Sequence, residues 1–171
     1  MQTTRDRGTT LEALHVGQPF RFYFRGEAAM GLKAQFDYGH GSEAALVLTS
    51  TKSGLKSGSL LSSFDVGNVV ELAGAEITLS TKPGTVTPGA NHFAEPAEIE
   101  LNDGRLFFVS RPHDNGIKYR IDLQSGTITR ATGAAPFEIY SEWSVVRGDD
   151  VLYEHQPQPE QGESVTVAVE N

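Results

Sequence analysis

At 171 residues and a formal net charge of −8, the chain has the size of one domain, and its acidity argues against a general role in nucleic-acid binding. It contains no cysteine, which excludes disulfides, thiolate metal sites and cysteine nucleophiles. Apolar runs such as 44–48 are far shorter than the about 20 residues that cross a bilayer, and the polar segment 1–10 lacks the pattern of a signal peptide. We therefore expect a cytoplasmic protein without a membrane span.

Residues 1–10 are expected to form a flexible arm before a β domain at 11–155. The clearest early strand is 20–25, where one face carries phenylalanines and the other carries polar and aromatic groups: Phe20, Phe22 and Phe24 against Arg21, Tyr23 and Arg25. The segment 44–49 is apolar on both faces, which is typical of an interior strand. Two further strands are predicted at 69–72 and 75–80.

The segment 98–131 predicts three strands joined by two tight turns, and a further turn at 124–126 leads into residues 127–129. Asn102-Asp103-Gly104 and Asn115-Gly116 accept the positive φ angles that hairpin turns require. Between Ile117 and Leu123 the odd residues are apolar and the even ones are Lys118, Arg120 and Asp122, which indicates a strand with one face in water. The segment 105–111 carries large apolar groups on both faces, so we expect it to be covered on both sides.

The segment 137–147 alternates again, with one apolar face formed by Phe137, Ile139, Trp143 and Val145. The segment 156–171 is predicted to be a polar linker followed by a C-terminal strand, because Val165, Val167 and Val169 alternate with other residues. This strand would pair with the sheet of its own chain or with the edge of a neighbouring subunit.

These elements predict an all-β fold, either an antiparallel β-sandwich or a partly open β-barrel, with about ten strands. Two halves, 11–80 and 97–155, share an order of two strands, a Ser-Gly turn and a late strand with a Val-Val pair. Duplication and convergent β patterning both explain this similarity.

The opening Leu11-x-x-Leu-x-Val-Gly-x-x-Phe, followed by Arg21-Phe22, resembles the start of short uncharacterised β-barrel domains of bacteria and their phages. The resemblance extends over about sixty residues. It implies a compact β unit and no activity.

Basic residues on two strands and one glycine-rich loop, 51–59, are candidates for binding an anion. An aromatic ring between two arginines can stack on and pair with an anionic ring, and a Gly/Ser/Lys loop can present amides and charge to a phosphate. The alternatives are a solvated outer face and a solvated loop. The candidate ligand-binding residues are Arg21, Tyr23, Arg25, Lys52, Lys56 and Arg120.

A metal or acid–base site is a weaker prediction, with the candidates Asp37, His40, His113 and Asp114. None of the five histidines has the spacing of a known ligand motif, and these residues are equally typical of turns. Because Gly-x-Ser-x-Gly and a P-loop are also absent from the sequence, we predict no catalytic residue and no cofactor.

The sequence thus favours a non-enzymatic binding or interaction protein that holds a small anionic ligand and forms a homo-oligomer through an edge strand. A phage-encoded accessory or anti-defence protein fits this size and charge. One alternative is a hydrolase that uses the His/Asp residues of the loops. Another is a structural component of a virion or a similar assembly.

Deletion of residues 157–171 is expected to lower the oligomeric state, the melting temperature or both. A free apolar strand on a protein surface invites pairing, and the linker before it can span about 20 Å when extended. Light scattering measures the mass in solution, and a thermal melt measures stability. A truncated protein that matches the full chain in both would contradict the prediction.

Overall fold

The computed structural model describes residues 8–37, 42–89, 92–113, 116–131 and 135–157. Strands account for 50% and helices for 6% of what it describes, which confirms the all-β prediction. In these ranges, no helix has the length and apolar character needed to cross a membrane. The C-terminal strand and the linker beyond Pro157 lie outside the described residues, so their role in assembly stays a prediction.

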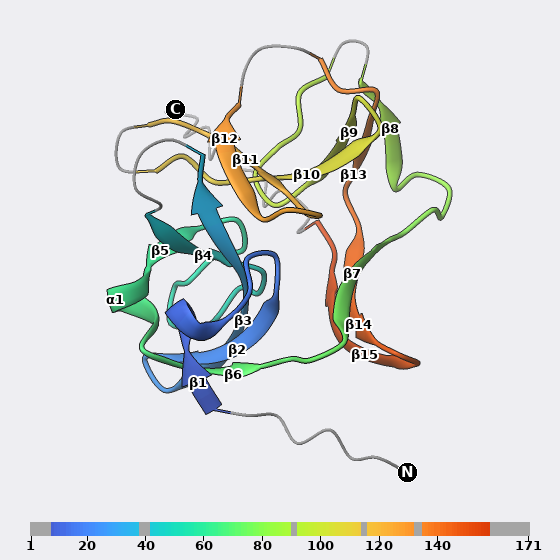
Figure 1. Cartoon of the computed structure of the whole chain (residues 1–171). Helices are drawn as coiled ribbons and strands as arrows, with labels where there is room; N and C mark the ends of the chain where they lie inside the picture. Colours follow the sequence, from blue (N-terminus) through green and yellow to red (C-terminus); the bar gives the residue numbers. More distant parts are fainter. Residues whose placement is uncertain (1–7, 38–41, 90–91, 114–115, 132–134, 158–171) are drawn as a thin grey trace, which may run out of the picture.

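The first part of the chain forms six strands and two short helical turns, and Figure 1 shows them gathered at the lower left. They are β1 (Gly8–Thr10), the 3-10 turn η1 (Leu11–Ala13), β2 (Pro19–Phe24), β3 (Glu27–Phe36), β4 (Glu43–Val47), β5 (Leu60–Ser62), α1 (Ser63–Val66) and β6 (Asn68–Glu71).

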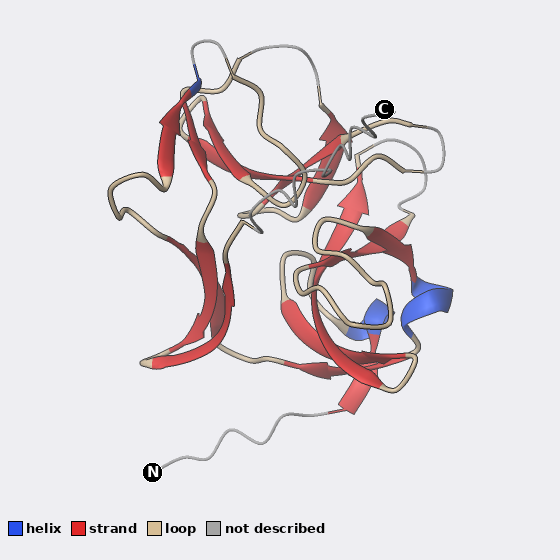
Figure 2. Cartoon of the chain, turned by 180° about the vertical axis from the view of Figure 1, so that it is seen from behind, coloured by secondary structure: helices blue, strands red, loops and turns tan. Residues whose placement is uncertain are grey.

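The remaining nine strands form the upper and right-hand parts of Figure 1, and Figure 2 shows the same arrangement from behind. They are β7 (Ala75–Leu79), β8 (Val86–Pro88), β9 (Ile99–Asn102), β10 (Arg105–Val109), β11 (Tyr119–Asp122), β12 (Thr127–Arg130), β13 (Glu138–Tyr140), β14 (Trp143–Arg147) and β15 (Asp150–His155). The fifteen strands of the described residues exceed the expected ten because β1 forms within the predicted arm, β5 and β8 form where no strand is predicted, and the segment 137–147 divides into β13 and β14.

Twelve strands form one large sheet with the order β1-β6-β2-β3-β12-β11-β10-β9-β13-β8, to which β4 and β5 attach through β3. The other three form a small sheet, β15-β14-β7. Every pairing is antiparallel except that of β3 with β12. The sheets do not close into a barrel, and the arrangement is compatible with the predicted β-sandwich.

The long strand β3 is the branch point of the large sheet. Its residues 27–32 pair with β2, residues 31–35 pair with β4, and residues 35–36 pair with β12. One strand therefore joins the first part of the chain to the second.

Strand β4 separates two hydrophobic cores. Ala44 and Leu46 pack into a core shared with the second part of the chain, which includes Trp143. Ala45 and Val47 pack into the core of the first part. All four side chains are buried, which confirms the predicted interior strand.

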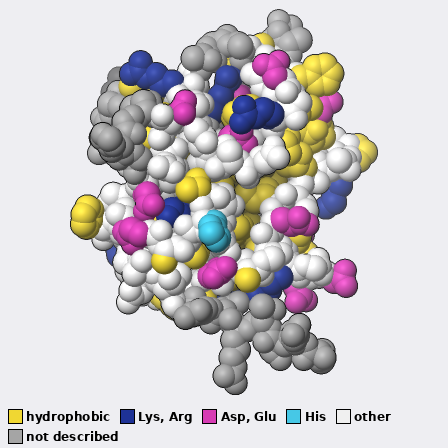
Figure 3. Space-filling view, in the orientation of Figure 1, with side chains coloured by type: hydrophobic (Ala, Val, Ile, Leu, Met, Phe, Trp, Pro, Cys, Tyr) yellow, Lys and Arg dark blue, Asp and Glu magenta, His cyan; other side chains and the backbone are white. Residues whose placement is uncertain are grey.

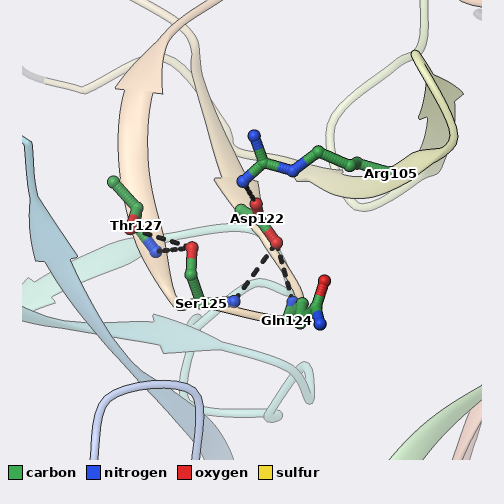
Figure 4. Close-up of polar contacts among 5 residues, drawn as sticks. All are labelled: Arg105, Asp122, Gln124, Ser125 and Thr127. Atoms are coloured by element: carbon green, nitrogen blue, oxygen red, sulfur yellow. Dashed lines mark hydrogen bonds and ion pairs between the residues drawn. The ribbon is translucent and has the colours of Figure 1, made fainter.

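Strand β11 is buried on both faces, so the predicted wet face is wrong for Arg120 and Asp122. Arg120 pairs with Glu100 of β9, and Asp122 pairs with Arg105 of β10. Figure 4 shows Arg105 reaching toward Asp122, whose Oδ1 also accepts hydrogen bonds from the backbone of residues 124 and 125 at 2.8 and 3.2 Å. These partners neutralise the charges, which lets polar side chains lie in positions that alternation assigns to water.

The segment 137–147 is two strands rather than one. Strand β13 belongs to the large sheet and β14 to the small one, and the chain changes sheet between them. As a result Ile139 packs beside Val109, whereas Trp143 packs in the shared core and Phe137 is 73% exposed. Strand β10 is covered on both faces only at its end, where Phe108 lies in the shared core and Val109 packs beside Ile139, whereas Arg105 at its start is exposed.

The two predicted halves share both sheets. Strand β7, from the segment 11–80, pairs along its whole length with β14, from the segment 97–155. Their origin by duplication stays a prediction.

A close backbone contact joins the two parts of the chain at Gly17 and Gly126. A Cβ atom on Gly126 would lie 2.5 Å from the Gly17 nitrogen and 3.0 Å from the Lys33 carbonyl oxygen. The Gly126 carbonyl accepts a hydrogen bond from the Gln35 N–H at 3.0 Å, next to the pairing of β3 with β12. Only glycine fits this position.

Gly126→Ala is expected to destabilise the protein far more than Gly104→Ala. Both residues have positive φ (69° and 73°), so both variants lose about 1 kcal/mol for the backbone conformation. Only Gly126 meets other atoms, whereas nothing lies within 4 Å of a Cβ on Gly104. Urea unfolding of the two variants measures the difference. Equal midpoints would show that the contact at Gly126 relaxes freely.

Candidate functional site

The loop 50–58, between β4 and β5, is held in shape by its own hydrogen bonds. The Thr51 N–H donates to the Leu55 carbonyl at 2.8 Å, and the Leu55 N–H donates to Thr51 Oγ1 at 3.2 Å. The Ser57 N–H donates to Ser50 Oγ at 3.0 Å. The predicted phosphate-binding loop therefore has a fixed conformation.

Arg111, just after β10, attaches this loop to the second part of the chain. Its backbone N–H donates to the Gly58 carbonyl and its Nε–H donates to the Ser57 carbonyl, both at 2.8 Å. Gly58 has φ 87°, and a Cβ there would lie 3.2 Å from the Ala97 nitrogen. The loop is thus packed closely against the chain at both 97 and 111.

A pocket of about 550 Å³, which we name the junction cleft, lies between this loop, the segment 95–98 and the end of β15. Its volume is within the range of small-molecule sites. The polar groups on which its chemistry depends are Lys56, Ser57, Glu98, Arg111, Tyr153 and His155.

The two basic groups of the junction cleft are Arg111 and Lys56. Within the described residues, no carboxylate lies at ion-pair distance from Arg111 or Lys56. The two acidic groups of the cleft have other partners. Glu95 pairs with Lys118 at 3.5 Å, and Glu98 accepts a hydrogen bond from the Glu95 backbone N–H at 2.7 Å. Burial, followed by the charge of Glu95, raises the pKa of Glu98.

The hydroxyl of Ser57 is buried in the wall of the junction cleft. Ser57 is 1% exposed, and its Oγ has no hydrogen-bond partner in the part of the chain that the structure describes. An unsatisfied buried hydroxyl costs free energy, which a ligand oxygen in the cleft would recover.

His155 and Tyr153 lie side by side at the end of β15. The His155 ring stacks on Trp143, with centroids 4.8 Å apart and planes 12° from parallel. Burial, and then the charge of Arg111, lower the pKa of His155, so its imidazole is neutral at pH 7. Burial raises the pKa of Tyr153, whose hydroxyl therefore stays protonated. The Tyr153 hydroxyl also bonds His155 Nδ1 at 3.5 Å, which uses one of the two donors, so the pair offers one neutral hydrogen-bond donor to the cleft.

The two lysines predicted on the loop 50–58 lie in different places. Lys56 lines the junction cleft. Lys52 is exposed on the same loop, and its backbone N–H donates to Glu27 Oε2 at 2.8 Å.

The prediction that Arg21, Tyr23 and Arg25 share one face of a strand is wrong for Arg25. Strand β2 ends at Phe24, and Arg25 lies in the following turn with φ 49° and its guanidinium 5.3 Å from the Phe24 ring centroid. Tyr23 is 67% exposed. Arg21 lines a smaller pocket of about 270 Å³ with Tyr153.

Arg120 lies in a separate pocket of about 530 Å³, beside its partner Glu100. Lys118, Arg130 and the exposed ring of Phe93 also line this pocket. Burial raises the pKa of Glu100, and Arg120 opposes that shift. The guanidinium of Arg120 thus already has an acidic partner.

The predicted metal or acid–base residues gain no support as a cluster. Asp37 and His113 are exposed, and His40 and Asp114 lie outside the described residues. Over the ranges that the structure describes, no group of three or more His, Asp or Glu residues is placed to hold a metal ion. The proposed roles of these four residues stay predictions.

Sequence reasoning did not select Arg111, Tyr153 or His155 as site residues. They come from the end of β10 and from β15, far from the loop 50–58 in sequence, and no spacing connects them. The only feature of the sequence that could have indicated Arg111 is its position on one face of the predicted segment 105–111.

No family model, no curated protein and no solved structure matches this chain. The junction cleft and the surface are therefore the features of the molecule that point to a function. On the face drawn in Figure 3, Lys and Arg side chains are scattered among Asp and Glu, and hydrophobic side chains gather in a band right of centre.

Acidification below about pH 6.5 is expected to destabilise the protein through His155. Because the folded state lowers the pKa of His155 from 6.5, the unfolded state binds more protons as the pH falls from 6.5 toward the folded pKa. Stability is full above 6.5 and declines below it, by at most about 1.4 kcal/mol per pH unit.

Urea unfolding of the wild type and of His155→Gln from pH 8 to pH 5 measures this contribution. The difference in stability between the two proteins should depend on pH in that window. His15→Gln, which changes an exposed histidine, is the matched control. A pH-independent difference for His155→Gln would refute the assignment.

Proposed function

We propose that this protein binds a small anionic ligand, through a carboxylate or phosphate group, in the junction cleft. The proposal rests on the hydrogen bonding and charge environment of Arg111. Its Nε–H is fixed by the Ser57 carbonyl at 2.8 Å, and none of the described carboxylates forms an ion pair with it.

Orientation of Arg111 by the backbone favours binding at this position. A guanidinium whose Nε is already bonded loses little conformational entropy when its remaining N–H groups meet a ligand. Carboxylates and phosphates match the planar fork of arginine, and charged hydrogen bonds of this kind are stronger than neutral ones.

The neutral groups of the cleft complement this charge. Ser57 Oγ and the bonded pair of Tyr153 and His155 can each donate to a ligand oxygen without adding negative charge. Lys56 is exposed at the same cleft and adds a second cation. A polar anion of low molecular weight therefore meets a cation and several donors in one pocket.

Arg111→Gln is expected to weaken binding about tenfold or more, because a hydrogen bond to a charged group contributes about 1.5–3 kcal/mol. Lys56→Gln should weaken it less, since Lys56 is solvated. Isothermal titration calorimetry with inorganic phosphate, citrate and AMP measures the affinities.

Arg130→Gln removes an exposed arginine outside the junction cleft and is the matched control for charge. It should leave the affinities unchanged. Absence of binding by all three probes, or an equal loss in Arg111→Gln and Arg130→Gln, would overturn the proposed function.

A further inference from the structure

We propose that the ligand of the junction cleft carries two anionic groups, and that Arg21 binds the second of them. This inference rests on the proposed function, because it assigns the first anionic group to Arg111. It identifies the ligand class as an elongated molecule with an anionic group at each end, such as a dicarboxylate or a bisphosphate.

The Arg21 pocket lies next to the junction cleft. This pocket and the junction cleft have Ser50 and Tyr153 as common lining residues, so the two spaces adjoin at these side chains. Arg21 lines the smaller pocket, and Arg111 lines the junction cleft. A ligand that passes Tyr153 would meet one arginine on each side of it.

The Arg21 pocket is built on paired strands. Arg21 lies opposite Met30 in the register of β2 and β3, and the Leu48 N–H donates to the Met30 carbonyl at 2.9 Å. The Met30 N–H donates to Oγ1 of the buried Thr49, also at 2.9 Å. These bonds fix the floor beneath Arg21, which favours a preformed pocket.

The charge of Arg21 is also unbalanced. The chain has 22 acidic and 14 basic residues, and the two buried cations of the described ranges have carboxylate partners: Lys33 with Glu43, and Arg120 with Glu100. Within the described ranges, no carboxylate pairs with the half-buried Arg21. An excess of acidic groups makes an unpaired, half-buried arginine notable.

Tyr153 is suited to the middle of such a ligand. Burial raises the pKa of its hydroxyl, so it carries no charge that would repel an anion. Its ring offers an apolar surface, while Ser50 Oγ is engaged by the Ser57 N–H at 3.0 Å. The border between the two pockets therefore favours a neutral linker between the two anionic ends.

The test is calorimetry of the full chain with single and double anions. The single anion is inorganic phosphate. The double anions are α,ω-dicarboxylates and alkanediol bisphosphates of increasing length, and these two series separate carboxylate from phosphate recognition. Wild type should bind the best-fitting double anion about tenfold or more tightly than phosphate.

Arg21→Gln should abolish that gain and leave the affinity for phosphate unchanged. Arg111→Gln should weaken both kinds of probe. Arg25→Gln, which changes an exposed arginine in the adjacent turn, is the matched control and should have no effect. Arg21→Lys keeps the charge and should restore part of the gain, which guards against a folding defect.

The outcomes separate the two proposals. If wild type binds phosphate through Arg111 but Arg21→Gln binds double anions as wild type does, the second anionic group is wrong and the proposed function stands. If wild type binds neither phosphate nor any double anion, the proposed function fails and this inference fails with it.

Discussion

The division of the interior into two cores by β3 and β4 is the constraint on which the rest of the structure depends. Because β4 is buried on both faces, neither core can form unless this strand is in place between them. Lys33 of β3 shows how strict the burial is. It is 2% exposed, and its ammonium group is bound by Glu43 at 2.8 Å and by the carbonyls of Glu12 and Leu14 at 2.9 Å. A cation in this position needs all three partners, since an unpaired buried charge would cost several kcal/mol.

The junction cleft follows from the same division. The first part of the chain contributes the loop 50–58 directly after β4, and the second contributes Arg111 and the end of β15. The bonds of Arg111 to the loop hold these walls in register. A pocket between two parts that share a core is rigid, and rigid walls reduce the entropy lost when a ligand binds.

The period-two pattern predicted what depends on local alternation. It predicted the strands of 98–131, the two-faced burial of β4 and the inward side of Tyr119 and Ile121, because those side chains lie where the pleat places them. It failed for Arg120 and Asp122, whose burial depends on partners from β9 and β10, and it merged β13 with β14 because alternation does not mark a change of sheet. For the same reason, only part of the junction cleft could be predicted from the sequence. Lys56 lies in a recognisable loop, whereas Arg111 and His155 join it only through tertiary contacts.

The acidic balance of the chain constrains how an anion can be recognised. A net charge of −8 repels anions at long range, so the protein cannot collect its ligand by electrostatic steering. That repulsion is screened beyond a Debye length of about 8 Å at physiological salt, whereas hydrogen bonds to an oriented guanidinium act at contact. Affinity must therefore come from short-range geometry at Arg111 and the hydroxyl groups around it. Such a site selects by shape and by the number of acceptors rather than by charge alone, because an anionic group without matching contacts gains little at a chain that is acidic overall.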